Sequence, residues 1–325
     1  MIVENSRFFR PVDMDSLTKL LADESLGHTM FMAGGTDLIP ALKRQGQSPQ
    51  SVIALSQIAE LKGIRLAAQE KALHLGPLTR LVDVAKDLLI KEHFPALAET
   101  AALVASPQIR NQATIGGNIM VDNRCKYYNQ SDVDRVSHGA CFKAGGGICH
   151  LIPKATPKSV PVCRARFVSD LAPVLILANT QLVIQGRSGE RLLPMKDLYE
   201  QEGLYGARLN PGEVLVGIEI PLPLPGMIRY DKLRIRQAID FPSLGVAMLK
   251  EKRGDKEILQ ACLTGVDTHP VHLEFVRQDY GSDEEFWQTV AQVAMKSVTP
   301  LKQDFFPPQY KRQMIPVLLK RLYKD

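Results

Sequence analysis

The chain has 325 residues, of which 45% are hydrophobic and 23% charged, a composition typical of a folded globular protein with more than one domain. No apolar run approaches the roughly 20 residues that span a bilayer, and the segment Met1–Arg10 lacks the hydrophobic stretch of a signal peptide. We therefore expect no membrane span and a cytoplasmic location, where grouped cysteines indicate a metal site rather than disulfides.

The positive charge is concentrated in one segment. The formal net charge is +5, from 40 basic and 35 acidic residues, and residues 122–166 alone hold eight basic and three acidic side chains. Four of the five cysteines lie in the same segment: Cys125, Cys141, Cys149 and Cys163. Thiols grouped in this way are more typical of a ligand set than of core packing. The fifth cysteine, Cys262, lies in an apolar run and is interpreted as a core residue.

Residues 1–56 are expected to form a small α/β unit. Asp13 or Asp15 can cap a helix that runs through Leu21, and a strand at 28–33 precedes a helix at 38–44. The connection between them reads Ala33-Gly34-Gly35-Thr36-Asp37. A strand, a glycine turn and a helix start can bind an anion, because their amides lack internal partners. Alone, however, two glycines more often form an ordinary tight turn.

Residues 57–223 are expected to form a middle α+β domain rather than a doubly wound Rossmann sheet. Thr79 can cap a helix through Leu89, and a turn is expected at Thr114-Ile115-Gly116-Gly117-Asn118. A second helix is predicted at 95–105, and strands are predicted at 72–75, 174–178, 181–185 and 214–220.

Residues 224–325 are expected to form a C-terminal α+β domain after a proline-rich linker at 221–226. Strands are predicted at 232–236, 244–250 and 258–263, and helices at 284–296 and 310–322.

Three segments, taken together, resemble the FAD-binding segments of the flavoprotein subunit or domain of the xanthine oxidase family of molybdenum hydroxylases. They are Ala33-Gly34-Gly35-Thr36-Asp37, Ala113-Thr114-Ile115-Gly116-Gly117-Asn118 and Ser169-Asp170-Leu171-Ala172-Pro173. The resemblance extends over nearly the whole chain. It implies the PCMH-type FAD-binding fold, with FAD as the cofactor.

The resemblance also implies which residues contact the flavin. Backbone amides of the first two segments would meet the pyrophosphate, assisted by the side chains of Thr36, Thr114 and Asn118. Asp170 would accept a hydrogen bond from a ribityl or ribose hydroxyl, although alone it would be interpreted as a helix cap. The implied cofactor-binding residues are Met32, Ala33, Gly34, Gly35, Thr36, Asp37, Val104, Ala105, Ser106, Ile109, Thr114, Gly117, Asn118, Ser169, Asp170, Leu215 and Lys232.

The 50 residues between Asn118 and Ser169 are an insert, because most of the family has only a few residues there. The cysteine spacing, C-x15-C-x7-C-x13-C, does not by itself distinguish zinc from iron–sulfur. The insert resembles that of the 4-hydroxybenzoyl-CoA reductase branch, which implies a 4Fe-4S cluster on Cys125, Cys141, Cys149 and Cys163. His138 and His150 are interpreted as surface or supporting residues.

This branch implies an electron-transfer subunit of an anaerobic, aromatic-degrading enzyme that reduces 4-hydroxybenzoyl-CoA to benzoyl-CoA on a partner subunit. The implied partners are a 2Fe-2S small subunit and a molybdenum-cofactor large subunit, in a dimer of heterotrimers. Ferredoxin would donate the electrons. The basic excess, which includes Lys143, Lys154 and Lys158, would attract this acidic donor, although each lysine alone is more often a solvated surface residue.

Two alternatives remain open. One is the FAD subunit of an NAD-linked hydroxylase with a structural zinc insert, and the other is a zinc-stabilised binding module without a redox role. Nucleic-acid binding is disfavoured because aromatic residues are few and no known binding module is present. No pattern indicates acid–base or nucleophilic catalysis in this chain.

Overall fold

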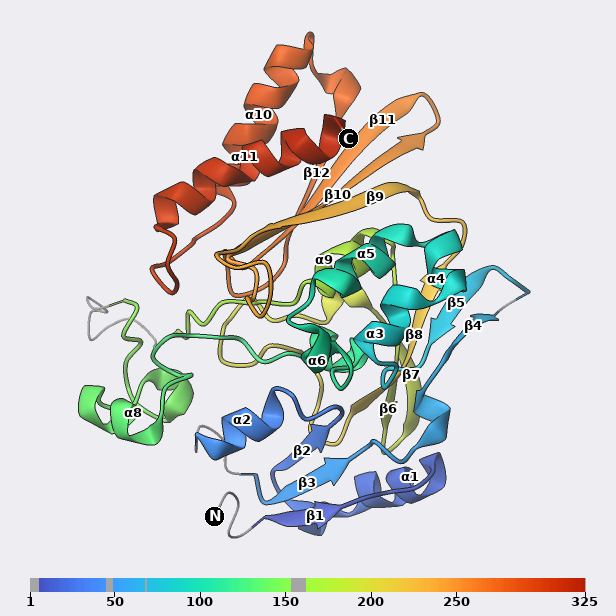
Figure 1. The fold of residues 1–325 in the computed structure, drawn as a ribbon, viewed down its shortest axis with the longest axis vertical. Coiled ribbons are helices and arrows are strands. Elements are labelled where there is room, and N and C mark those ends of the chain that lie inside the picture. Colours follow the sequence, from blue (N-terminus) through green and yellow to red (C-terminus); the bar gives the residue numbers. More distant parts are fainter. Residues whose placement is uncertain (1–5, 45–48, 68, 153–161, 325) are drawn as a thin grey trace.

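The computed structural model describes residues 6–44, 49–67, 69–152 and 162–324. Three β-sheets lie along the molecule, and helices cover them (Figure 1). The mixture of antiparallel sheets and packed helices confirms the α+β class. The expected divisions of the chain at residues 56 and 223 stay predictions.

The first sheet is small and parallel, with strand order β1-β3-β2. Of the two predicted caps, Asp13 is the one that caps the first helix, because its side chain accepts a hydrogen bond from the Ser16 amide at 2.7 Å. The elements of this part are β1 (Arg7–Phe9), α1 (Met14–Ala22), β2 (Thr29–Met32), α2 (Leu38–Lys43) and β3 (Ser51–Ala54).

The middle sheet is antiparallel, in the order β4-β5-β8-β6-β7. Its strands are β4 (Ile64–Ala67), β5 (Ala72–Leu75), β6 (Gln181–Gly186), β7 (Gly189–Pro194) and β8 (Val214–Pro221). The helices before the insert are α3 (Leu81–Lys86), α4 (Leu88–His93), α5 (Pro95–Leu103), α6 (Pro107–Arg110) and α7 (Ile115–Ile119).

Two predictions for this part were wrong. Thr79 does not cap a helix, because its hydroxyl bonds the backbone of Gly63 at 3.0 and 3.1 Å and the chain becomes helical only at Leu81. The expected strand at 174–178 belongs to a helix, α9 (Leu171–Leu177), which is buried on all sides. A continuous apolar run shows no period that separates a buried helix from a buried strand.

The third sheet is antiparallel, in the order β12-β11-β10-β9, and α10 and α11 cover one of its faces (Figure 1). The expected strand at 232–236 was partly wrong, since β9 ends at Leu233 and a loop follows. The elements are β9 (Gly226–Leu233), β10 (Leu244–Arg253), β11 (Lys256–Thr264), β12 (Val271–Val276), α10 (Asp283–Lys296) and α11 (Pro308–Lys324).

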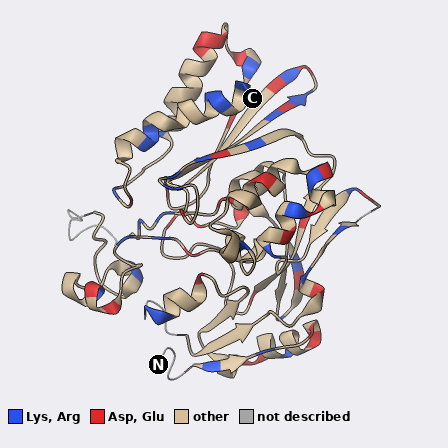
Figure 2. Ribbon diagram, in the orientation of Figure 1, with Lys and Arg blue, Asp and Glu red and all other residues tan. Residues whose placement is uncertain are grey.

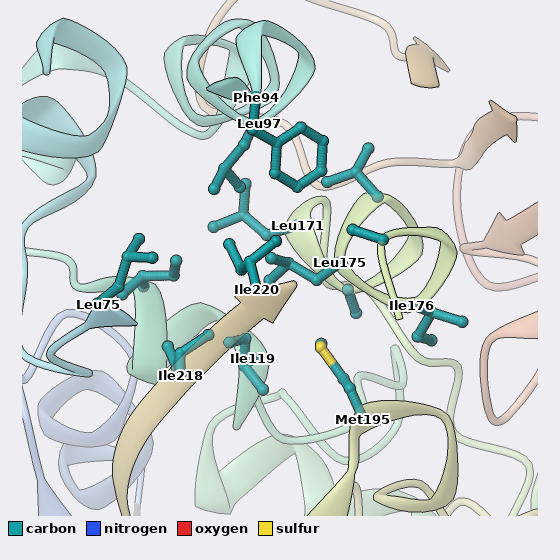
Figure 3. Close-up of a cluster of buried hydrophobic side chains, with 14 of the residues drawn as sticks. Leu75, Phe94, Leu97, Ile119, Leu171, Leu175, Ile176, Met195, Ile218 and Ile220 are labelled. Carbon is teal, nitrogen blue, oxygen red and sulfur yellow. The ribbon is translucent and has the colours of Figure 1, made fainter. Parts of the chain in front are cut away.

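The main core lies around α9, where the middle and third sheets meet. Leu171 and Leu175 of α9 pack with Leu97 of α5 and with Ile218 and Ile220 of β8 (Figure 3). Ala247 of β10 and Cys262 of β11 join the same cluster, so Cys262 is a core residue as expected. Within the described residues, no helix is both long and apolar enough to cross a membrane.

Candidate cofactor sites

The two glycine segments lie against each other. A Cβ on Gly34 would stand 2.0 Å from the carbonyl oxygen of Gln112, so only glycine permits this approach. A Cβ on Gly117 would face the first segment, 3.9 Å from the Cβ of Ala33, and would lie 3.1 Å from Thr114 Oγ1. These two segments, far apart in sequence, therefore lie side by side.

The second glycine segment is the short helix α7 rather than a turn, which corrects the sequence prediction. Thr114 caps this helix, because its Oγ1 accepts a hydrogen bond from the Gly117 amide at 3.1 Å. Asn118 Oδ1 accepts hydrogen bonds from Ser169 Oγ at 2.7 Å and from the Leu171 amide at 3.2 Å. The third segment is thus joined directly to the second, despite the insert between them.

Asp170 lies in a buried ion pair. Its Oδ1 is 2.9 Å from Lys232 Nζ and accepts a hydrogen bond from the Tyr230 hydroxyl at 2.8 Å. Burial raises the pKa of Asp170, and Lys232 and Tyr230 oppose that rise. The aspartate and lysine expected at the flavin therefore meet each other, and sequence reasoning missed Tyr230, which the β9 pattern alone could not single out.

The remaining expected flavin residues lie in two places. Ala105 has a left-handed backbone (φ 45°) and its carbonyl accepts a hydrogen bond from the Ile239 amide at 3.0 Å. Ser106 caps α6, because its Oγ accepts a hydrogen bond from the Ile109 amide. The carbonyl of Val104, on the other side of Ala105, accepts a hydrogen bond from Arg110 Nη1 at 2.7 Å. Leu215 is buried in β8 opposite Ile184 of β6, where its side chain packs in the main core.

The cysteine insert leaves and rejoins the body of the molecule at one point. The amide and carbonyl of Arg124 pair with the carbonyl and amide of Arg166, both at 2.9 Å. The segments that lead into and out of the insert carry several Lys and Arg positions (Figure 2), and the insert holds α8 (Asp132–His138). The insert is therefore a loop whose two ends meet at the body of the molecule.

All four cysteines of the insert line a single cavity. Cys125, Cys141 and Cys163 are buried and Cys149 is partly exposed. The cavity is lined by Cys125, Tyr127, Tyr128, Cys141, Phe142, Lys143, Cys149, His150, Cys163 and Ala165. The fold thus gathers a ligand set that the sequence spreads over almost 40 residues.

Burial disfavours the thiolate form of two cysteines of this cavity, Cys125 and Cys163. Burial raises the pKa of Cys125, against the opposing effect of the Tyr127 and Tyr128 amides. Burial also raises the pKa of Cys163 to about 12. In the described ranges, no three Cys, His, Asp or Glu side chains come close enough together to hold one metal ion.

Lys143 is part of the cavity wall, so its interpretation as a solvated surface residue was wrong. Its ammonium donates to Asp122 Oδ1 at 2.7 Å and to the carbonyls of Gly203 and Leu204 at 3.1 and 2.5 Å, and its side chain is only 4% exposed. These partners are distant in sequence, so no local pattern could indicate them. Lys154 and Lys158 lie outside the described residues.

The two histidines differ. His138 lies on exposed α8, where its Nδ1 is 2.9 Å from the Asp134 carbonyl. His150 lines the cysteine cavity, and its Nε2 bonds the Gly139 carbonyl at 2.8 Å.

Comparison with known proteins establishes the class. The family model described as the FAD binding domain in molybdopterin dehydrogenase matches residues 4–223. The chain therefore belongs to this family and is the FAD-binding oxidoreductase subunit of a molybdenum hydroxylase of the xanthine oxidase and CO dehydrogenase type.

Individual relatives agree with this class. The aldehyde oxidoreductase FAD-binding subunit of Escherichia coli K12 is 28% identical over 252 residues, 75% of this chain and 76% of the relative. The carbon monoxide dehydrogenase medium chain of Hydrogenophaga pseudoflava is 26% identical, in an alignment that covers 90% of this chain and 86% of the relative. The fold matches that of CO dehydrogenase from Oligotropha carboxidovorans with a TM-score of 0.74 and 23% sequence identity. The match covers 99% of this chain and 97% of the other.

The Asp170–Lys232 pair yields a stability prediction. Lys232→Met leaves a buried carboxylate without its cation, so we expect a loss of about 3–5 kcal/mol in the free energy of unfolding. The variant's Asp170 has a pKa above that of the unfolded chain, so the loss is largest at neutral pH and shrinks as the pH falls and the carboxyl is protonated. Urea unfolding at several pH values measures both effects.

Lys232→Met with Asp170→Asn should recover most of the lost stability, because no buried charge remains. Lys302→Met, at an exposed lysine, is the control. A Lys232→Met variant as stable as the parent chain at neutral pH would contradict the buried pair.

Proposed function

We propose that this chain is an FAD- and 4Fe-4S-containing electron-transfer subunit of a cytoplasmic molybdenum enzyme that reductively dehydroxylates 4-hydroxybenzoyl-CoA to benzoyl-CoA. The observation that supports this most directly is the single cavity lined by Cys125, Cys141, Cys149 and Cys163. Its insert leaves the chain between the second and third flavin segments and rejoins it through the Arg124–Arg166 backbone pair.

We infer that the flavin pyrophosphate binds where the two glycine segments meet. Gly34 lets the first segment pack directly on the backbone of Gln112, and Gly117 presents its backbone beside Ala33 without a side chain. The turn before α2 offers the backbone amides of the first segment. The first amides of α7 already donate within the protein, those of Ile115 and Gly116 to the carbonyls of Thr79 and Pro77 and that of Gly117 to Thr114 Oγ1. We infer that the phosphates bind between Met32–Asp37 and Thr114–Asn118, that Ser169 positions Asn118, and that the buried Asp170–Lys232 pair fixes the third segment.

The cysteine cavity suits a cluster better than a single ion. Tetrahedral zinc, with Zn–S bonds of about 2.3 Å, needs its thiolates almost in contact with one another. A cubane cluster binds each thiolate at a separate corner and spaces them further apart. Four cysteines that surround a cavity without converging on one point fit the second arrangement.

When bound, FAD exchanges one or two electrons and a 4Fe-4S cluster exchanges one. The chain's own residues hold these groups and exclude water from them. Cys125 and Cys163 are buried thiols, and Lys143 places a fixed positive charge in the cavity wall that stabilises the negative charge of a thiolate set. The reaction on the CoA thioester would take place on a partner subunit.

The partners we propose are a 2Fe-2S small subunit and a molybdenum-cofactor large subunit, in a dimer of heterotrimers, with ferredoxin as the electron donor. The names of the relatives, a FAD-binding subunit and medium chains, support membership of a larger complex. The basic segments at the neck of the insert support an acidic donor such as ferredoxin (Figure 2).

The test of this function is the iron content of cysteine variants purified without oxygen. Cys125→Ser and Cys141→Ser should each lose a cluster's worth of iron and the broad visible absorbance, while FAD supplied in excess still binds. Cys262→Ala removes a core thiol outside the insert and should keep its iron. Unchanged iron in both Ser variants would refute the ligand assignment, and a colourless protein with stoichiometric zinc would favour the zinc-stabilised module instead.

A second test addresses the proposed flavin site between the glycine segments. Gly117→Val should abolish FAD binding, because the branched side chain would occupy the space between Thr114 and Ala33 through which the backbone approaches the phosphates. Gly147→Val is a matched control, since a Cβ at Gly147 meets no atom within 4 Å. Retention of stoichiometric FAD by Gly117→Val, measured by absorbance, would rule out this pair of segments as the site.

A third test addresses the donor. The rate of reduction by ferredoxin should fall steeply with added salt, because salt screens the attraction between opposite charges. Lys154→Glu with Lys158→Glu should slow it further, whereas a small neutral donor should be unaffected. A ferredoxin rate that responds to neither change would contradict electron entry near the insert.

A further inference from the structure

The insert contacts both ends of α2, the helix that follows the first flavin segment. Figure 1 shows α8 of the insert beside α2. At the start of α2, Arg124 Nη1 is 2.5 Å from Oδ1 of the N-cap residue Asp37. At its end, Arg135 Nη2 donates to the carbonyl of the C-cap residue Arg44 at 2.5 Å. Two arginines from one insert therefore hold one short helix at its two ends.

Arg135 is fixed within the insert. Its side chain is 7% exposed, and its Nη1 donates to the carbonyls of Gln130 and Tyr128 at 2.6 and 3.3 Å. Tyr128 lines the cysteine cavity. One guanidinium thus joins the wall of the cavity to the end of α2.

Arg124 is fixed on the other side. Its backbone pairs with Arg166 at the neck of the insert, its guanidinium lies 4.6 Å from the centre of the Phe241 ring, and the next residue is Cys125. Its partner Asp37 closes the first glycine segment. The position of this segment therefore depends on the position of the first cysteine of the cavity.

We propose that the insert is a clamp on the first flavin-binding segment, and that Arg124 and Arg135 are positioning residues for FAD. An insert that is ordered around its cluster holds Asp37 and α2 in place. The flavin then meets a pre-formed segment, so less conformational entropy of that segment is lost on binding. By linkage, FAD binding stabilises the filled insert to the same degree.

This inference rests on the proposed flavin site and goes beyond it. A partly exposed ion pair such as Arg124–Asp37 contributes little by itself. Arg135 differs, because it is buried and its three carbonyl partners would lose a charged donor. The effect on FAD comes from fixing both ends of a helix that has only six residues and a single buried side chain, Leu42.

The experiment is a titration of flavin-depleted, iron-loaded chain with FAD, followed by flavin fluorescence. Arg124→Gln and Asp37→Asn should each weaken FAD binding about fivefold, and Arg135→Met about tenfold or more. The double variant Arg124→Gln/Asp37→Asn should bind no worse than the weaker single variant, because the two changes remove the same contact. Removing iron from the parent chain should weaken FAD binding to the same extent as Arg135→Met.

Lys126→Gln is the matched control, since it removes one positive charge from the exposed surface of the insert without touching α2. FAD affinity equal to that of the parent in Arg124→Gln and Arg135→Met would overturn the clamp. If Gly117→Val then abolishes binding, the flavin site stands without it; if Gly117→Val binds normally, the site itself fails. If Arg135→Met loses its iron, its FAD affinity no longer tests the clamp. The double-mutant cycle at the partly exposed Arg124–Asp37 pair then tests it, and additive losses of FAD affinity would overturn the clamp.

Discussion

The structure depends on keeping Asn118 and Ser169 together although 50 residues separate them. Asn118 Oδ1 accepts hydrogen bonds from Ser169 Oγ and the Leu171 amide, and the Arg124–Arg166 backbone pair closes the insert just beyond. A long insertion is tolerated when its ends are already close, because the entropy of loop closure grows slowly with length. The cysteine segment could therefore be added without opening the flavin-binding body.

The same closure places the insert where it contacts other parts of the molecule. Arg166 Nη1 reaches Asp304 Oδ2 at 2.5 Å, and Lys311 Nζ of α11 shares that carboxylate at 2.8 Å, so the neck is anchored to the C-terminal part. On the other side Arg124 and Arg135 reach α2. The insert is therefore bonded to the C-terminal part of the chain on one side and to α2 on the other. These contacts are the reason why we propose that the two cofactor sites are coupled.

The sequence predicted the elements that interactions between neighbouring residues determine. Asp13 caps α1, β5 and β8 form at short apolar runs bounded by turn residues, and α10 and α11 lie where helices are expected near the end of the chain. The glycine segments and the grouped cysteines were visible as motifs. What failed depended on distant partners: the apolar run of α9 has no distinguishing period, and Lys143 is buried by Asp122 and two carbonyls some 60 residues further on.

The most direct test is anomalous X-ray scattering at the iron edge, from crystals of the protein purified without oxygen and loaded with FAD. The account predicts iron density in the cavity lined by Cys125, Cys141, Cys149 and Cys163, and the flavin pyrophosphate between Gly34 and Gly117. Anomalous signal at the zinc edge alone, or flavin density away from both glycine segments, would contradict it.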